Sequence, residues 1–276
     1  MSPASPTANA VRVPTRRAVV EQVMGMPISI HVRGEGARGT EVEEAIEVGL
    51  VGLHQVDEVF STWRSDSAIE RLRRGEVAIA QCPPDVALVI ELCGVARDRT
   101  AGWFDHRLPD SSGTCRIDPT GLVKGWAVER AKSVIVEALE QQGLTRMDVA
   151  VNAGGDVAVH RGTPDGRPWM VGIEDPADRT RILTTIALDA GGIATSGNAA
   201  RGAHIVNPFT GERVARRGSV TVYGPSLMWA DVFATAAFAF GDGCANWVSG
   251  LPGFRPEGYA VVVVNPNGEL VHLGAP

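Results

Sequence analysis

The chain has 276 residues, of which 44% are hydrophobic and 21% are charged, and its formal net charge at pH 7 is −6. This composition is typical of a folded globular protein with a substantial core, and the length allows one large domain or two small ones. The negative charge, without a basic stripe interleaved with aromatic residues, argues against a protein that binds nucleic acid. No run of about 18 apolar residues occurs, so we expect no membrane insertion.

The first residues are rich in Ser, Pro and Ala and lack the apolar segment of a secretion signal. We therefore expect a disordered leader at 1–16 and one domain over 17–276. The four cysteines lack metal-ligand spacing, which favours reduced thiols in a cytoplasmic protein, although a disulfide would also be compatible with the sequence.

Hydrophobic periodicity and turn residues predict a mixture of strands and helices. The expected strands lie at 17–23, 27–33, a short segment ending at 117–118, 147–151, 157–160, 169–173, 182–188, 219–223, 259–264 and 269–273. The expected helices lie at 41–60, 67–73, 85–97 with Asp85 as N-cap, 121–142 and 226–240. Because these elements do not alternate as regular βαβ units, the pattern favours an α+β fold with mixed or antiparallel sheets and flanking helices.

The helix expected at 226–240 contains one charged residue, Asp231, in an otherwise apolar sequence. Burying a carboxylate is costly unless a cation or hydrogen-bond donors meet it. Thr235 follows one helical turn later and lies on the same face, so the pair could offer a carboxylate and a hydroxyl to a hard cation such as Mg²⁺. The alternative is an Asp231 that points outward or is satisfied by backbone N–H groups.

The segment DPTGLVKG at 118–125 places Asp118 at a strand end and Lys124 in the first turns of a helix. Helix N-termini attract phosphate groups, and a lysine adds a positive charge. The order of residues differs from that of a Walker A loop. A capped surface helix with a solvated lysine would explain the same residues.

Two glycine-containing segments follow. NAGGD at 152–156 could let the backbone approach a ligand, and a plain hairpin turn explains it equally well. GIATSGN at 192–198 is interpreted as a turn that offers hydroxyls and amides, and it is followed by HIVNP at 204–208. His204 could act as a general base, because histidine titrates near neutral pH, or it could be structural.

Two aromatic segments, FSTWRSDS at 60–67 and GWFD at 102–105, each set an aromatic residue among turn residues. Such a residue could stack on a planar ligand, and core packing is the alternative.

The order and spacing of these segments together resemble the FAD:protein FMN transferase family, the ApbE-type flavin transferases. The matching segments are Met24-Gly25, FSTWRSDS, GWFD, DPTGLVKG, NAGGD, ATSGN, HIVNP and ADVFAT at 230–235. The resemblance extends over nearly all of residues 17–276. It implies an α+β fold related to the T-fold, with FAD bound in a cleft between lobes and Mg²⁺ at its pyrophosphate. Enzymes of this family move FMN from FAD onto a Thr or Ser hydroxyl of an acceptor flavoprotein and release AMP.

The resemblance also implies roles for individual residues. His204 would deprotonate the acceptor hydroxyl, and Asp231 would be the second catalytic residue through the metal. The metal would be held by the side chains of Asp231 and Thr235 and the carbonyl groups of Gly121 and Ala234. The implied contacts to FAD come from Met24, Trp63, Trp103, Phe104, Asp105, Asp118, Lys124, Asn152, Gly154, Gly155, Thr195 and Ile205.

The chain departs from the family pattern at Asn198 and Asn207, where Asp is usual, and in the short segment before His204. A shortened loop could alter acceptor recognition or weaken transfer. The family's usual lipoprotein signal is also missing, which points to a cytoplasmic acceptor, expected to carry an Asp-x-x-[Ser/Thr]-Gly-Ala-[Ser/Thr] motif. Two other functions stay open: an FAD pyrophosphatase that gives FMN and AMP, and a non-catalytic FAD-binding protein.

Overall fold

The computed structural model describes residues 15–109, 115–164, 166–200 and 202–274. The strands are β1 Arg16–Val23, β2 Met26–Arg33, β3 Arg107–Pro109, β4 Cys115–Ile117, β5 Asp148–Ala153, β6 Asp156–His160, β7 Trp169–Glu174, β8 Ile182–Leu188, β9 Gly191–Gly197, β10 Ser219–Gly224, β11 Ala260–Val264 and β12 Leu270–Leu273. The α-helices are α1 Thr40–Phe60, α2 Ala68–Arg73, α3 Pro84–Arg99, α4 Thr120–Gln141, α5 Leu227–Phe240 and α6 Cys244–Ser249, and a short 3-10 helix, η1, spans Ile79–Gln81.

Eight strands form the central sheet, in the order β1-β2-β5-β6-β9-β10-β11-β12. All neighbouring strands in it are antiparallel. Several pairs are hairpins, among them β5 and β6, whose register from Val149↔His160 to Ala153↔Asp156 leaves only Gly154 and Gly155 in the turn. Gly154 and Gly155 have φ values of 62° and 103°, which glycine adopts without steric cost.

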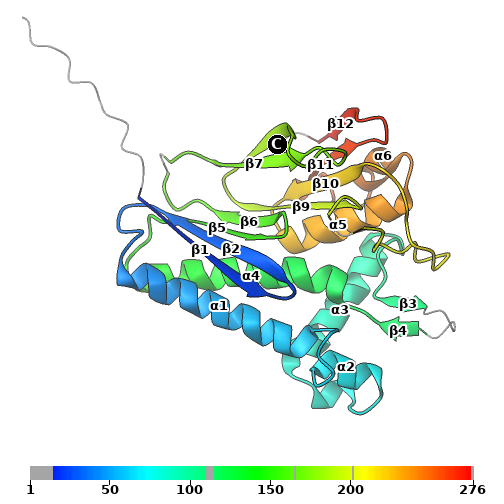
Figure 1. Ribbon diagram of the computed structural model, residues 1–276, viewed down its shortest axis with the longest axis horizontal. Helices are drawn as coiled ribbons and strands as arrows, with labels where there is room; N and C mark the ends of the chain where they lie inside the picture. Colours follow the sequence, from blue (N-terminus) through cyan, green and yellow to red (C-terminus); the bar gives the residue numbers. More distant parts are fainter. Residues whose placement is uncertain (1–14, 110–114, 165, 201, 275–276) are drawn as a thin grey trace, which may run out of the picture.

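Three long helices cover one face of this sheet, with α4 lying between α1 and α5 (Figure 1). Helix α5 is apolar on nearly all sides, as expected for a helix surrounded by protein, and it packs on β9, β10 and α4. Residues of α1, α4, α5 and the helix-facing side of the sheet form the main hydrophobic core.

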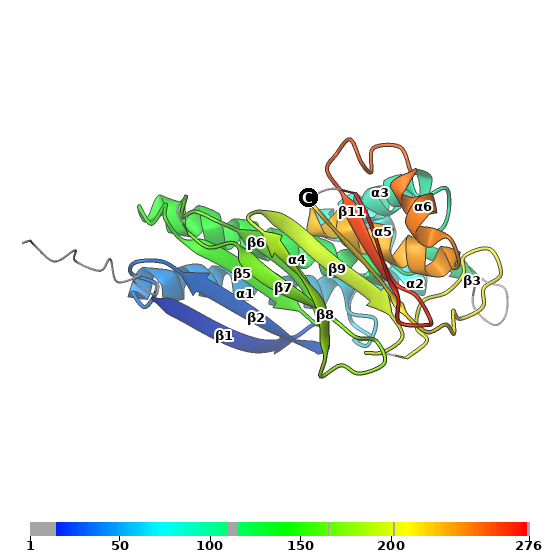
Figure 2. The ribbon, with the colours of Figure 1, turned by 90° about the horizontal axis from the view of Figure 1, so that it is seen from above.

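The hairpin of β7 and β8 covers part of the opposite face (Figure 2). Ile173, Ile186 and Leu188 of the hairpin pack against Ala150 and Val159 of the sheet in a second, smaller core. The central strands therefore bury side chains on both faces, since five of the six residues in each of β5 and β10 are buried.

The predicted α+β class, the antiparallel sheet and the flanking helices are confirmed. Each strand and helix expected from the sequence is present, with ends shifted by a few residues. The expected leader at 1–16 falls almost wholly outside the described residues, and β1 already begins at Arg16. Among the described helices, none is both long enough and apolar enough to cross a membrane.

Two interpretations of the sequence were wrong. Residues 195–197 are not a turn, because they belong to β9, which pairs with β6 and β10 in the middle of the sheet. Asp85 is not the N-cap of α3, since Pro83 occupies that position and Pro84 begins the helix. The Asp85 carboxylate instead accepts a hydrogen bond of 2.6 Å from Arg130 of α4.

Candidate active site

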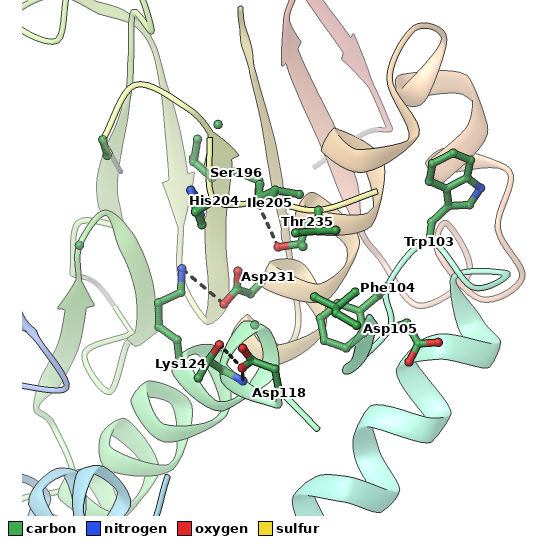
Figure 3. Close-up of a pocket in the computed structure, with 18 residues that line it drawn as sticks. Trp103, Phe104, Asp105, Asp118, Lys124, Ser196, His204, Ile205, Asp231 and Thr235 are labelled. Atoms are coloured by element: carbon green, nitrogen blue, oxygen red, sulfur yellow. Dashed lines mark hydrogen bonds and ion pairs between the residues drawn. The ribbon is translucent and has the colours of Figure 1, made fainter. Parts of the chain in front are cut away.

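A cavity of about 230 Å³ lies where the first turns of α4, helix α5 and strand β9 meet two loops (Figure 3). It unites most residues that the sequence singled out. The residues predicted from the sequence that line this cavity are Trp103, Phe104, Asp105, Asp118, Gly121, Lys124, Gly154, Thr195, His204, Ile205, Asp231 and Thr235.

Helices α4 and α5 approach each other closely beside this cavity. A Cβ atom at Gly125 would lie 3.0 Å from Met228 Cα and 3.2 Å from Asp231 Cβ, a spacing that only glycine permits without a shift. The side chain of Glu129, one turn further along α4, accepts hydrogen bonds from Ser226 Oγ at 2.8 Å and Met228 N at 3.0 Å. The start of α5 is thereby fixed against α4, and Lys124 and Asp231 are brought together.

Asp231 is buried and faces the Lys124 ammonium group from the neighbouring helix (Figure 3). Lys124 Nζ lies 3.5 Å from Asp231 Oδ2, and it also forms an ion pair with Oδ2 of buried Asp156. The sequence alone allowed an Asp231 that points outward, but its side chain points into the molecule and lines the cavity. Two carboxylates share one ammonium group, so this cluster has a formal charge of −1.

Oxygen donors suited to a hard cation stand beside this cluster. Thr235 lies one turn after Asp231, and its Oγ1 is 3.1 Å from Ser196 Oγ, so Thr235 also faces β9. Gly121 lines the same cavity. In the described part of the chain no group of three or more His, Cys, Asp or Glu side chains could hold a metal ion. The donors fit Mg²⁺, which commonly uses one or two carboxylates and takes its other ligands from water and substrate phosphates.

Asp118 is held in place from both sides at the entrance to α4. Its Oδ1 accepts hydrogen bonds from Thr120 N at 3.1 Å and Thr120 Oγ1 at 2.6 Å, and its Oδ2 lies 3.1 Å from an Arg73 guanidinium nitrogen. Arg73 also donates to the carbonyl of Ile117. The Asp118 carboxylate therefore has a fixed orientation at the cavity wall.

His204 lies on the loop between β9 and β10 and is exposed to solvent. Its Nδ1 is 2.9 Å from the carbonyl oxygen of Gly202. A carbonyl can only accept, so Nδ1 is the donor in this contact, and in the Nδ1–H tautomer the lone pair lies on Nε2. The base of the loop is tied by Asn198, whose Nδ2 donates to the carbonyls of Val214 at 2.7 Å and Arg216 at 3.0 Å.

Aromatic residues form the wall opposite β9. Phe104 is buried and packs near Gly121, where a Cβ would lie 3.2 Å from its ring. The Trp103 ring makes edge contacts with Phe209, Phe240 and Trp247 at centroid distances of 4.8, 5.0 and 6.3 Å. This cluster connects the loop that carries His204 to the end of α5.

Two titratable groups whose pKa values are shifted by burial lie close to this wall. Burial, with smaller contributions from the charges of Asp118 and Asp105, raises the pKa of Cys93 to about 12, so this thiol is protonated and inert at neutral pH. Burial also lowers the pKa of His106 below its ordinary value, although the Asp105 carboxylate opposes this shift. His106 is therefore neutral near pH 7.

Five residues named from the sequence do not line this cavity. Trp63 is 94% exposed in the turn after α1, and Met24 lies in the β1–β2 turn with a φ of 56°. Asn152 accepts a hydrogen bond from Gly155 N at 3.0 Å and so stabilises the β5–β6 turn. Ala234 is fully buried within α5. The roles in FAD or metal binding that the sequence suggested for these five residues stay predictions.

Asp156 and Arg73 were not predicted as residues of the site. Asp156 lies in NAGGD directly before the apolar run VAV, which was a usable signal, because strand residues there are buried. Arg73 had no comparable signal, since its partner Asp118 is distant in sequence. The hydroxyl of Ser196 was expected from GIATSGN, but its contact with the distant Thr235 was not.

The fold and the cavity define an α+β protein with a polar site suited to a phosphate-containing ligand and a hard cation. The model of the ApbE family matches residues 106–253, more than half of the chain, and the chain belongs to this family. The matched segment includes every residue placed above on α4, β9, the His204 loop and α5.

Similar proteins include two called FAD:protein FMN transferase. The one from Salmonella typhimurium is 30% identical over 183 residues, which are 62% of this chain and 48% of that protein. The one from Klebsiella pneumoniae is 30% identical over 164 residues, which are 55% of this chain and 43% of that protein. The alignments thus span less than half the length of these relatives.

Solved structures of similar fold include the ApbE protein of Thermotoga maritima, with a TM-score of 0.77 at 20% identity over 94% of this chain and 97% of that one. The flavin transferase ApbE of Vibrio cholerae has a TM-score of 0.71 at 21% identity over 95% of this chain and 98% of that one. At these identities the likeness concerns the fold.

Proposed function

We propose that this chain transfers FMN from FAD to a Ser or Thr hydroxyl of an acceptor flavoprotein, releases AMP, and uses Mg²⁺. The observation that carries the proposal is that Lys124, Asp231 with Thr235, and His204 all line one cavity in a member of the ApbE family. The names of the similar proteins from Salmonella typhimurium and Klebsiella pneumoniae support the same reaction.

The start of α4 is suited to the pyrophosphate of FAD. Thr120, Gly121 and Lys124 line the cavity at the N-terminus of this helix, where the helix dipole and the ammonium group attract negative charge. Phe104 and Trp103 offer apolar surface for the flavin ring on the adjoining wall.

Asp231 and Thr235 would hold the cation, together with water and phosphate oxygens. When bound, Mg²⁺ would neutralise negative charge on the pyrophosphate as the phosphoanhydride bond breaks. The ammonium group of Lys124 adds a second positive charge on the side of α4.

His204 serves as the general base in this proposal. Its Nε2 takes the proton of the acceptor hydroxyl, whose oxygen forms a bond to the phosphorus on the FMN side of the pyrophosphate. The bond between this phosphorus and the bridging oxygen breaks, and AMP leaves with that oxygen. The exposed position of His204 suits this role, because the hydroxyl arrives on another protein.

The test is incubation of the purified chain with FAD, Mg²⁺ and an acceptor domain carrying the Asp-x-x-[Ser/Thr]-Gly-Ala-[Ser/Thr] motif. The matched control is the same domain with Ala at the accepting hydroxyl. Flavin fluorescence that stays with the acceptor on a denaturing gel, and only when the hydroxyl is present, is the expected result. AMP with no labelled acceptor would instead indicate an FAD pyrophosphatase, and bound FAD with no AMP would indicate a non-catalytic FAD-binding protein.

A further inference from the structure

Asp156 is a buried carboxylate that lies behind the cavity and does not line it. It is the first residue of β6, directly after the turn of Gly154 and Gly155. Asp156 pairs with Ala153 of β5, and this pair closes the hairpin next to the turn. The carboxylate therefore has a fixed position relative to β9 and α4.

Each oxygen of Asp156 has its own partner. Oδ1 accepts a hydrogen bond of 3.0 Å from the backbone N–H of Thr195 in β9. Oδ2 forms the ion pair with the ammonium group of Lys124. The first contact fixes the rotation of the carboxylate, and the second fixes where the Lys124 side chain ends.

Lys124 thus stands between two buried carboxylates that compete for one positive charge. Its contact with Asp156 is the closer of the two, and Asp231 Oδ2 lies 3.5 Å away. A carboxylate fully paired with an ammonium group would attract a divalent cation less, because the local charge that draws the cation would be cancelled.

We propose that Asp156 is a positioning residue that holds the Lys124 ammonium group toward β6 and thereby keeps the charge of Asp231 effective for a divalent cation. The inference rests on the proposed function, because it takes Asp231 as the residue that binds the cation. Asp156 acts through Lys124 and does not touch the reacting groups.

The Asp156→Asn variant tests this role with little change in shape. Its side-chain oxygen can still accept from Thr195 N, while the negative charge that holds Lys124 is lost. The ammonium group is then expected to move onto Asp231, and the affinity for Mn²⁺ measured in the presence of FAD is expected to fall about tenfold. Binding is read from the electron paramagnetic resonance signal of free Mn²⁺, which does not depend on transfer activity.

A second variant separates positioning from a simple charge effect. If Asp156 acts through Lys124, adding Asp156→Asn to the Lys124→Met variant leaves the Mn²⁺ affinity of Lys124→Met unchanged, because no ammonium group remains to be positioned. If Asp156 attracts the cation by its own charge, Asp156→Asn lowers the Mn²⁺ affinity in the Lys124→Met background as well, and the proposal is overturned. Unchanged affinity in Asp156→Asn overturns it as well.

Asp148 provides a matched control. It is also buried, its Oδ1 accepts from the N–H of Thr163 at 2.9 Å, and its Oδ2 pairs with Arg33 at 2.8 Å, away from the cavity. Asp148→Asn should leave Mn²⁺ affinity unchanged. If the wild-type chain itself binds no Mn²⁺ with FAD, the cation site of the proposed function fails, whereas failure confined to the Asp156 variants refutes only the positioning role.

Discussion

Gly125 of α4 lies directly against Asp231 of α5, because a Cβ atom added at Gly125 would lie only 3.2 Å from Asp231 Cβ. We therefore expect Gly125→Ala to push the helices apart, to lower the free energy of unfolding by about 1–3 kcal/mol, and to weaken FAD binding. Urea unfolding and quenching of flavin fluorescence measure the two effects.

The control for this substitution is Gly94→Ala on α3, where nothing lies within 4 Å of the added Cβ. This change should raise the free energy of unfolding by about 0.5–1 kcal/mol through the better helix propensity of alanine. If Gly125→Ala has the stability and FAD affinity of the wild type, the site does not require the close approach of α4 and α5.

His204→Ala and Asp231→Ala should both abolish most transfer, for different reasons. Loss of a general base is expected to slow transfer about 10²- to 10⁴-fold while FAD and Mn²⁺ still bind. Asp231→Ala should in addition remove the dependence of the residual rate on Mg²⁺. Initial rates of acceptor labelling over a Mg²⁺ titration distinguish the two variants, and transfer at the wild-type rate in His204→Ala would refute the assignment of the base.

Asn198 and Asn207 have different structural roles. Asn198→Asp removes the two N–H donors that hold the carbonyls of Val214 and Arg216. We expect it to lower the free energy of unfolding by about 1–3 kcal/mol and to expose the loop of His204 to limited proteolysis.

Asn207→Asp is the comparison for Asn198→Asp. Asn207 Oδ1 accepts from the N–H groups of Phe209 and Thr210, at 2.9 and 3.3 Å, and an aspartate can accept the same hydrogen bonds. Stability and proteolysis should therefore stay as in the wild type. Equal effects of the two substitutions would show that Asn198 does not anchor the loop.

Stability should decrease on acidification through histidines that are neutral in the folded state. Burial is the main cause that lowers the pKa values of His31, His106 and His160 below 6.5. Above pH 6.5 both the folded and the unfolded chain keep these rings neutral. Below it the unfolded chain takes up protons more readily, so this contribution to the free energy of unfolding falls.

Urea midpoints at about pH 7.5 and about pH 5.5 measure this dependence. His106→Gln should make the decrease smaller, because one of the three groups no longer titrates. If the urea midpoint of His106→Gln falls between the two pH values as much as that of the wild type, His106 does not contribute to the pH dependence of stability.

Much of the fold followed from local patterns, because residues 226–240 form one continuous apolar segment and strands β1 and β2 alternate between more and less buried residues. Strand β9 could not be predicted in this way, since its sequence GGIATSG is dominated by glycine and small residues, and its pairing with β6 and β10 is decided by distant residues. The segments of the site were recognised as a set through their order. The contacts between these segments could not be predicted from the sequence, because a contact such as that of Lys124 with Asp156 depends on the register of the β5–β6 hairpin.

The most direct test of the proposed transfer is the ratio of AMP released to flavin bound covalently to the acceptor. Both are measured in one reaction of the wild-type chain with FAD, Mg²⁺ and the hydroxyl-bearing acceptor. The account predicts one AMP for each acceptor-bound flavin, throughout the time course, because a single bond cleavage produces both. AMP that accumulates without bound flavin, or FAD that stays intact in the cavity, would contradict it.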